Sequence, residues 1–230
     1  MDKIKHEKIL AAKEAVKFVE DGMVLGLGTG STAGFAIAEI GAMVKAGLRM
    51  TAVPTSAETE EQARSLGIPI VSIDEVDSID LTIDGTDEFD ADLNLIKGGG
   101  GALLKEKMVA RMTRRQVIIA DSTKMVKTLG AFNVPVEVIP YAVGYAERLI
   151  EAIGGRAHIR LREGANFLTD ERNYIIDADF GLIRDAYKVS DNLNDIEGVV
   201  CNGLFLDLTD IVIVGIGNSI EVFTREDQQG

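Results

Sequence analysis

The chain has 230 residues, of which 46% are hydrophobic and 27% are charged, a composition typical of a globular protein with a buried core. Its 24 basic and 37 acidic residues give a formal charge of −13, which argues against a nucleic-acid surface because phosphate backbones require clustered Lys and Arg. No apolar run approaches the roughly 18 residues of a membrane span, so we expect no membrane contact. The acidic excess serves solubility in this interpretation, and an anionic substrate would depend on local positive groups.

The first residues alternate charged and apolar side chains where a signal peptide would be continuously apolar, which predicts a cytoplasmic protein. Cys201 is the single cysteine, which excludes an intrachain disulfide. We expect it to pack as an apolar side chain, with a reactive thiol as the alternative. His6 and His158 are the only histidines, which leaves too few soft ligands for a zinc site.

Helices and strands alternate through the first half of the chain. Apolar residues on one helical face predict a helix over 3–20, and a short apolar strand over 23–27 then leads through a glycine loop into a helix ending near residue 45. The elements expected next are strands near 49–53, 69–71, 79–84 and 115–121, and helices near 56–66 and 101–112. This alternation predicts a mostly parallel, doubly wound sheet.

The pattern changes after residue 127. Two prolines flank a strand-like VEVI at 136–139, a helix is expected over 142–153, and two further strand–helix patterns follow. The apolar segment 211–216 predicts a strand that is buried on both faces and therefore returns to the large sheet.

Together these elements predict an α/β fold, in which a Rossmann-like, mostly parallel sheet domain carries a smaller inserted α+β domain. We assign residues 1–130 and 206–230 to the large domain. Residues 131–205 form the small domain in this interpretation.

The first glycine loop, Gly28–Thr32, ends a predicted strand and opens a helix, so its N–H groups and the helix dipole would face an anion, most naturally a phosphate. Gly28, Gly30 and Ala33 also satisfy the loose dinucleotide fingerprint. That function requires an acid at the end of the second strand, and none is found before Glu58. No Walker loop is present, and a turn that simply needs glycine remains the alternative.

An acidic cluster, DGTDE at 84–88, follows the strand predicted over 79–84, and such strand ends line the ligand crevice of open parallel sheets. Asp84 and Asp87 could converge on one small ligand across Gly85, and their mutual repulsion would help one of them to hold and donate a proton. A solvated turn is the alternative.

A calcium loop is a second interpretation of this region. Asp90, Asp92 and Asn94 imitate its first three ligands. Leu95 and Gly101 stand where such a loop requires its turn glycine and its bidentate glutamate, which argues against calcium.

Lys97 is followed by four glycines, Gly98–Gly101, an arrangement that is costly to order unless the backbone must approach a ligand. Lys97 would supply charge, and Glu106, about one turn into the following helix, would reach back to the site unless it is an ordinary solvated glutamate. Lys124, after the last strand of the first half, and Lys8, on the first helix, are further candidate cations, with surface lysines as the alternative.

These motifs resemble the type A family of ribose-5-phosphate isomerases, and the resemblance covers the whole chain. The motifs, in order, are GLGTGSTA at 26–33, DGTDE at 84–88, KGGGGALLKEK at 97–107, ADSTK at 120–124, VPVEVIP at 134–140 and IGGR at 153–156. The main departure is Gly101-Ala102-Leu103-Leu104, where many relatives carry alanine and polar residues. The resemblance implies an aldose–ketose isomerase of the non-oxidative pentose phosphate pathway that needs no cofactor or metal and assembles as a homodimer or homotetramer.

By the same resemblance, Glu106 is the general base that forms an enediolate from ribose 5-phosphate or ribulose 5-phosphate. Lys97 and the glycine loop stabilise the enediolate, while Asp84 opens the furanose ring and Asp87 flanks the sugar. The substrate-binding residues that it implies are Thr29, Gly30, Ser31, Thr32, Asp84, Gly85, Thr86, Asp87, Lys97, Gly98, Gly99, Gly100, Lys124 and Lys8.

Other functions remain possible at this point. An amino-sugar phosphate deaminase of related fold would need a histidine in the active loops, and a coenzyme A transferase would form a thioester on its glutamate. A non-catalytic sugar-phosphate sensor would require an attached DNA-binding module, for which we expect no room before Met23.

Overall fold

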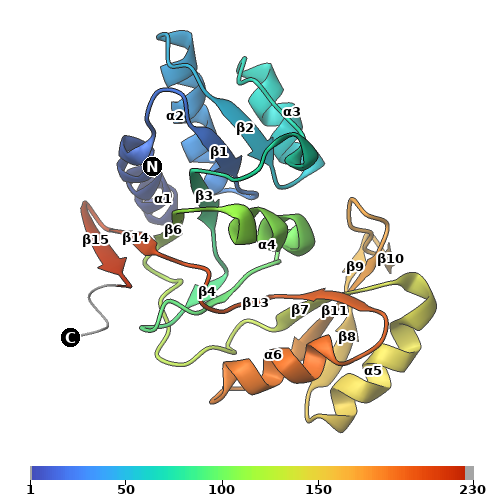
Figure 1. Ribbon diagram of the computed structural model, residues 1–230. Coiled ribbons are helices and arrows are strands. Elements are labelled where there is room, and N and C mark those ends of the chain that lie inside the picture. Colours follow the sequence, from blue (N-terminus) through green and yellow to red (C-terminus); the bar gives the residue numbers. More distant parts are fainter. Residues whose placement is uncertain (1, 226–230) are drawn as a thin grey trace. The chain divides into compact units, whose positions relative to one another are not determined.

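The computed structural model describes residues 2–225 (Figure 1). Contacts along the chain divide it into two compact units. The first unit comprises Met1–Thr86, Lys105–Met125 and Asp207–Gly230, and the second comprises Asp87–Leu104 and Val126–Leu206.

The first unit is built on a six-stranded sheet with the strand order β15-β14-β6-β3-β1-β2. Its strands are β1 (Val24–Leu27), β2 (Thr51–Pro54), β3 (Leu81–Gly85), β6 (Gln116–Asp121), β14 (Ile211–Ile216) and β15 (Ser219–Thr224). All neighbouring pairs are parallel except β14 and β15, which form an antiparallel edge. The mostly parallel α/β sheet is therefore confirmed, and β14 returns to it beside β6 as predicted.

Helices cover both faces of this sheet. They are α1 (Lys3–Ala15), α2 (Ala33–Lys45), α3 (Ala57–Ser65) and α4 (Leu103–Met112), with short 3-10 turns at η1 (Val16–Phe18) and η2 (Ile73–Glu75). Alanines let α1 pack closely on the face that it shares with α2, whereas Val109 of α4 packs on the opposite face. A Cβ at Gly26 would lie 2.6 Å from Val109 Cγ1, so this glycine allows α4 to approach β1. No helix among residues 2–225 is long and apolar enough to cross a bilayer.

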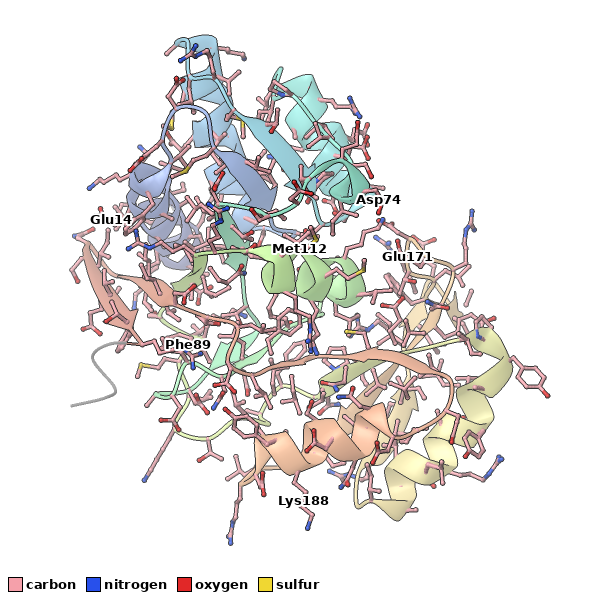
Figure 2. The ribbon with its side chains drawn as sticks, in the orientation of Figure 1. Glu14, Asp74, Phe89, Met112, Glu171 and Lys188 are labelled. Carbon is pink, nitrogen blue, oxygen red and sulfur yellow. The ribbon has the colours of Figure 1, made fainter. Side chains whose placement is uncertain are left out.

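The second unit contains an antiparallel sheet with the order β12-β7-β11-β8, together with a hairpin and a small three-stranded sheet, β13-β5-β4. The strands of the larger sheet are β7 (Val134–Val138), β8 (Arg156–Ile159), β11 (Tyr174–Asp179) and β12 (Val199–Asn202). The smaller pieces are β4 (Glu88–Phe89), β5 (Leu95–Ile96), β9 (Leu161–Arg162), β10 (Ala165–Asn166) and β13 (Leu204–Phe205). Phe89, labelled in Figure 2, is fully buried in the small sheet.

The helices of the second unit are α5 (Val143–Ala152), preceded by the 3-10 turn η3 (Pro140–Ala142), and α6 (Ala186–Asn194). Alternate valines of β7 pack with both helices in one core cluster. Because side chains alternate along a strand, Pro135 and Glu137 lie on the other face of the sheet.

Several elements differ from those predicted. The strand expected near 69–71 is only an isolated bridge between Ala52 and Ile70. The three residues of this segment, which follows a helix, are too few for a regular ladder of strand hydrogen bonds. The helix expected over 3–20 is α-helical only to Ala15 and ends in a 3-10 turn. Segment 87–104, which the sequence suggested for the large domain, groups with the second unit because β5 pairs with β13.

Candidate functional site

The first glycine loop joins β1 to α2 in the first unit, and Asp84 holds its backbone. The Asp84 carboxylate lies at the carboxyl end of β3, where its Oδ1 accepts hydrogen bonds from Thr29 N–H at 3.2 Å and Gly85 N–H at 2.7 Å. A Cβ at Gly28 would lie 2.1 Å from Asp84 Oδ1, and Gly30 has a φ of +101° that favours glycine. The loop geometry therefore depends on glycine and on Asp84 together.

A cluster of hydroxyl groups supports the same loop from β2 and α3. The Thr29 hydroxyl lies 2.7 Å from that of Thr55, 2.8 Å from that of Ser56 and 3.1 Å from that of Thr59. Thr59 also donates to the carbonyl of Gly28 at 2.9 Å. Sequence reasoning missed this support, although the Thr-Ser step directly after a predicted strand was a visible signal.

Lys8 brings a positive charge to the glycine loop. Its Nζ donates to Ser31 Oγ at 2.9 Å and lies 3.9 Å from Asp121 Oδ2, so a residue of α1 joins the loop to the end of β6. Lys124 lies in the turn after β6, where its N–H donates to Asp121 O at 3.2 Å. The two predicted cations thus both lie by the carboxyl edge of the sheet.

Glu7, the neighbour of Lys8 on α1, is fully buried and holds the ends of two strands. Its carboxylate accepts hydrogen bonds from Ser122 N–H, Ser122 Oγ and Gly217 N–H at 3.1, 2.7 and 2.8 Å. Burial raises the pKa of Glu7, but the hydrogen bonds from Gly217 and Ser122 outweigh it and lower the pKa to about 2. No sequence pattern pointed to this residue.

Glu106 lies in the first turn of α4 and is only 5% exposed, so it is not a solvated surface glutamate. The end of α4 lies beside the start of β3, because Arg114 N–H donates to Ile79 O at 2.8 Å. The helix spans about 15 Å, most of the roughly 20 Å length of β6, so its first turn lies toward the carboxyl edge of the sheet. Asp84, the penultimate residue of β3, lies at the same edge.

Asp87, Lys97 and the loop Gly98–Gly100 belong to the second unit, whereas Thr86 is the last residue of the first segment of the first unit. Lys97 is only 2% exposed, and its Nζ lies 5.5 Å from the centre of the Phe205 ring. Gly99 N–H donates to Asp87 Oδ2 at 2.7 Å, and the carbonyls of Gly98 and Gly99 accept from Arg160 Nη1. Asp87 and the glycine run therefore form one hydrogen-bonded assembly, to which Arg160 is an unpredicted addition.

The residues that imitate a calcium loop bond to one another. Asp90 Oδ1 accepts from Asp92 N–H at 3.0 Å and from Asn94 N–H at 2.9 Å, and Asp90 Oδ2 accepts from the Asn94 amide at 3.3 Å. Among the described residues, no group of three or more His, Cys, Asp or Glu side chains is arranged to hold a metal ion. Cys201 is buried, with its Sγ 3.8 Å from Leu103 O.

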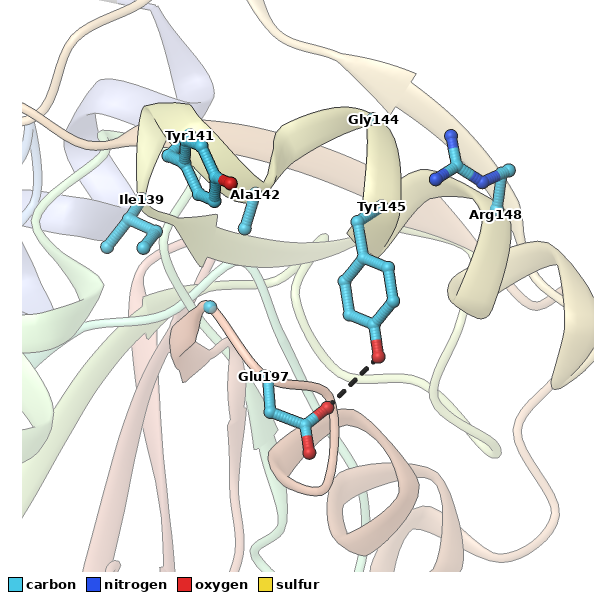
Figure 3. Close-up of a pocket in the computed structure, with 8 residues that line it drawn as sticks. Ile139, Tyr141, Ala142, Gly144, Tyr145, Arg148 and Glu197 are labelled. Carbon is cyan, nitrogen blue, oxygen red and sulfur yellow. Dashed lines mark hydrogen bonds between the residues drawn. The ribbon is translucent and has the colours of Figure 1, made fainter.

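A separate open pocket of about 610 Å³ lies in the second unit, at the start of α5 (Figure 3). Its rim includes Tyr145, whose hydroxyl donates to Glu197 Oε2 at 3.1 Å, and the exposed Tyr141. The hydrogen bond to Glu197 raises the pKa of Tyr145. The lining residues are Ile139, Tyr141, Ala142, Gly144, Tyr145, Arg148, Glu197 and Gly198, which do not overlap the predicted site.

Comparisons with known proteins agree over nearly the whole chain. The family model of ribose 5-phosphate isomerase A (phosphoriboisomerase A) matches residues 51–219. Ribose-5-phosphate isomerase A from Cereibacter sphaeroides (strain KD131 / KCTC 12085) is 50% identical, and that from Ruegeria sp. (strain TM1040) is 47% identical. Each of these alignments covers 97% of this chain and 88% of the relative.

Solved structures give the same result. A D-ribose-5-phosphate isomerase in complex with phospho-erythronic acid superposes with a TM-score of 0.94 at 40% identity, covering 96% of this chain and 99% of its own. Ribose 5-phosphate isomerase A from Methanocaldococcus jannaschii superposes with a TM-score of 0.90 at 42% identity, covering 94% and 97%.

Proposed function

Because the chain belongs to the ribose 5-phosphate isomerase A family, we propose that it interconverts ribose 5-phosphate and ribulose 5-phosphate in the non-oxidative pentose phosphate pathway. The observation that carries this proposal is the similarity to isomerases along almost the full length of both chains. The complex of one such structure with phospho-erythronic acid, a sugar-acid phosphate, supports a sugar phosphate as the substrate. A cytoplasmic location is part of the proposal.

Glu106 is the general base in this proposal. It removes the proton from the carbon beside the carbonyl, an enediolate forms, and the proton returns to the neighbouring carbon. Two features support the assignment: the carboxylate is shielded from water, and the first turn of α4 favours negative charge through the helix dipole. The same carboxylate can serve both carbons, which is what an isomerisation requires.

The other roles follow the family motifs. Lys97 and the loop Gly98–Gly100 stabilise the negative oxygen of the enediolate, where one well-aimed donor contributes roughly 3–4 kcal/mol. Asp84 moves the proton that opens the furanose ring, and Asp87 flanks the sugar. Gly85 and Thr86 connect these two aspartates in the sequence and are further substrate-binding residues in this proposal.

The phosphate group is assigned to the first glycine loop. Gly30, Ser31 and Thr32 offer backbone N–H groups at the start of α2, and Thr29, whose own N–H donates to Asp84, belongs to the same loop. Lys8, which already contacts Ser31, supplies positive charge there, and Lys124 is a further substrate contact.

The test is to pretreat the purified protein with chelator, add ribose 5-phosphate and follow ketose formation. We expect turnover without added metal, and we expect Glu106→Gln to lose on the order of 10²–10⁴-fold in kcat while its melting temperature stays near that of the wild type. Glu61→Gln, which changes an exposed glutamate of α3, is the matched control. Near-normal kcat in Glu106→Gln would remove this residue from the role of base, and substrate binding without conversion would favour a sensor.

A further inference from the structure

The Gly98–Gly99 peptide is held from both of its sides within the second unit. Its N–H, that of Gly99, donates to Asp87 Oδ2 at 2.7 Å, while Arg160 Nη1 donates to its carbonyl, that of Gly98, at 2.8 Å and to the next carbonyl, that of Gly99, at 3.1 Å. Ordering a run of glycines costs more backbone entropy than ordering any other residue type. Side-chain hydrogen bonds to the N–H and to the carbonyl of the Gly98–Gly99 peptide offset part of that cost.

Arg160 is itself fixed by Asp177. Its Nε donates to Asp177 Oδ2 at 2.9 Å and its Nη2 to Asp177 Oδ1 at 2.5 Å, a two-pronged pairing that sets the plane of the guanidinium. The Arg160 side chain is only 13% exposed and lies 5.7 Å from the centre of the Phe167 ring. Asp177 belongs to β11 and Arg160 directly follows β8, so two paired strands carry this ion pair.

The glycine loop also packs against the same part of the sheet. A Cβ at Gly98 would lie 3.2 Å from Pro135, the residue that pairs with Asp177 in the β7–β11 register. A Cβ at Gly101 would lie 2.4 Å from the Phe167 ring, and the φ of Gly101 is +86°. The loop therefore follows the surface formed by Arg160, Phe167 and Pro135 closely.

We propose that Arg160, held by Asp177, is a positioning residue that fixes the conformation of the glycine loop for catalysis. This inference rests on the proposed function, in which the loop acts on the substrate. Carbonyl oxygens carry partial negative charge and would repel a phosphate or enediolate oxygen. The guanidinium cation of Arg160 binds two of these carbonyls. The loop is thereby kept in one conformation that can accept an anion.

A lysine could not replace this arginine. The guanidinium uses two N–H groups for Asp177 and a third for the loop carbonyls at the same time, whereas an ammonium group is a point charge without that planar geometry. Arg160→Lys is therefore expected to keep the charge but to retain only part of the wild-type loop order and kcat.

The experiment compares Arg160→Met with Arg156→Met in two measurements. Arg156 pairs with Asp179 across the same two strands, but its side chain is 77% exposed and no glycine-loop contact is involved, which makes it a matched control. We expect Arg160→Met to speed amide hydrogen exchange in a peptide covering residues 97–104 by on the order of tenfold. We also expect it to lower kcat about 10–100-fold with a smaller change in KM, while Arg156→Met changes neither.

The proposal is overturned if folded Arg160→Met shows wild-type exchange in residues 97–104, or if Arg156→Met has the same effects. If Arg160→Met does not fold, Asp177→Asn, which keeps the shape of the acid but loses its charge, must show the same direction of change in both measurements. The exchange measurement needs no turnover, so it decides whether Arg160 orders the loop even if the wild-type protein does not isomerise ribose 5-phosphate. A wild-type protein without isomerase activity would refute the proposed function instead.

Discussion

Glu7 is a buried side chain whose charge has a calculable effect on stability. Its folded-state pKa of about 2 lies below the ordinary value of 4.5, so its contribution to stability is present above pH 4.5 and is lost as the pH falls toward 2. Replacing this carboxylate, which accepts three hydrogen bonds, removes interactions worth on the order of 2–3 kcal/mol at neutral pH.

We therefore expect Glu7→Gln to melt at a lower temperature than the wild type at pH 7, with a difference that shrinks below pH 4.5. Thermal unfolding followed by circular dichroism from pH 3 to 7 measures this. Glu14→Gln is the control on the same helix, because its pair with Lys17 is exposed and contributes little. A melting difference that is independent of pH would mean that Glu7 acts through packing rather than through its charge.

Glu137 in β7 has a pKa that is shifted upward, in the opposite direction to that of Glu7. It also connects elements of the second unit. Its Oε1 accepts from Thr169 Oγ1 and Asn173 Nδ2, both at 2.9 Å, so it holds the segment before β11 against the sheet. Burial raises its pKa, although the hydrogen bonds from Asn173 and Thr169 lower it in part. The folded protein thus keeps this proton at pH values where the unfolded chain has released it.

With a raised folded-state pKa, the contribution of Glu137 to stability is complete below pH 4.5 and is lost as the pH rises through the folded-state value. Glu137→Gln keeps the accepting oxygen without a charge, so we expect this variant to gain in melting temperature relative to the wild type as the pH rises above 4.5. Melting curves from pH 4 to 9 test this. A wild-type stability that increases across that range in parallel with the variant would contradict the assignment.

Long periodic elements were predictable because their signal is local. The apolar faces of α1 and α2 and the continuous apolar run of β14 each lie within one stretch of sequence. The strands β4, β5 and β13 have two residues each, too few to show a period, and they form only because distant segments pair. The edge strand β15 follows β14, and its residues are exposed or half-buried without a regular alternation, so it carries no strong apolar signal.

The candidate site divides in the same way. Its glycine loops and carboxylates stand in motifs, so the sequence could propose them as site residues. Arg160 contacts the loop from 61 and 62 positions away along the chain, and Glu7 contacts Ser122 from 115 positions away. Nothing near either residue in the sequence marks it as a partner, since the pairing depends on the tertiary fold.

At the scale of the whole molecule, the surface suggests association. Single exposed apolar side chains are ordinary, but Tyr141 is 98% exposed and stands on the rim of a pocket with two further exposed apolar residues, Ile139 and Tyr145. Leu161 and Leu182, also of the second unit, are more than half exposed. A group of exposed apolar side chains such as Ile139, Tyr141 and Tyr145 around one pocket is typical of protein interfaces.

We accordingly expect a homodimer or homotetramer in solution, with a mass two or four times the 24.7 kDa of the chain. Because buried apolar area drives association, the oligomer should withstand high salt, which screens exposed charges but not apolar contacts. Sedimentation velocity over a wide range of protein concentration, at low and high salt, measures both the mass and its salt dependence. A mass of one chain at every concentration would refute the assembly, and dissociation in salt would show that charge pairs rather than apolar side chains hold it together.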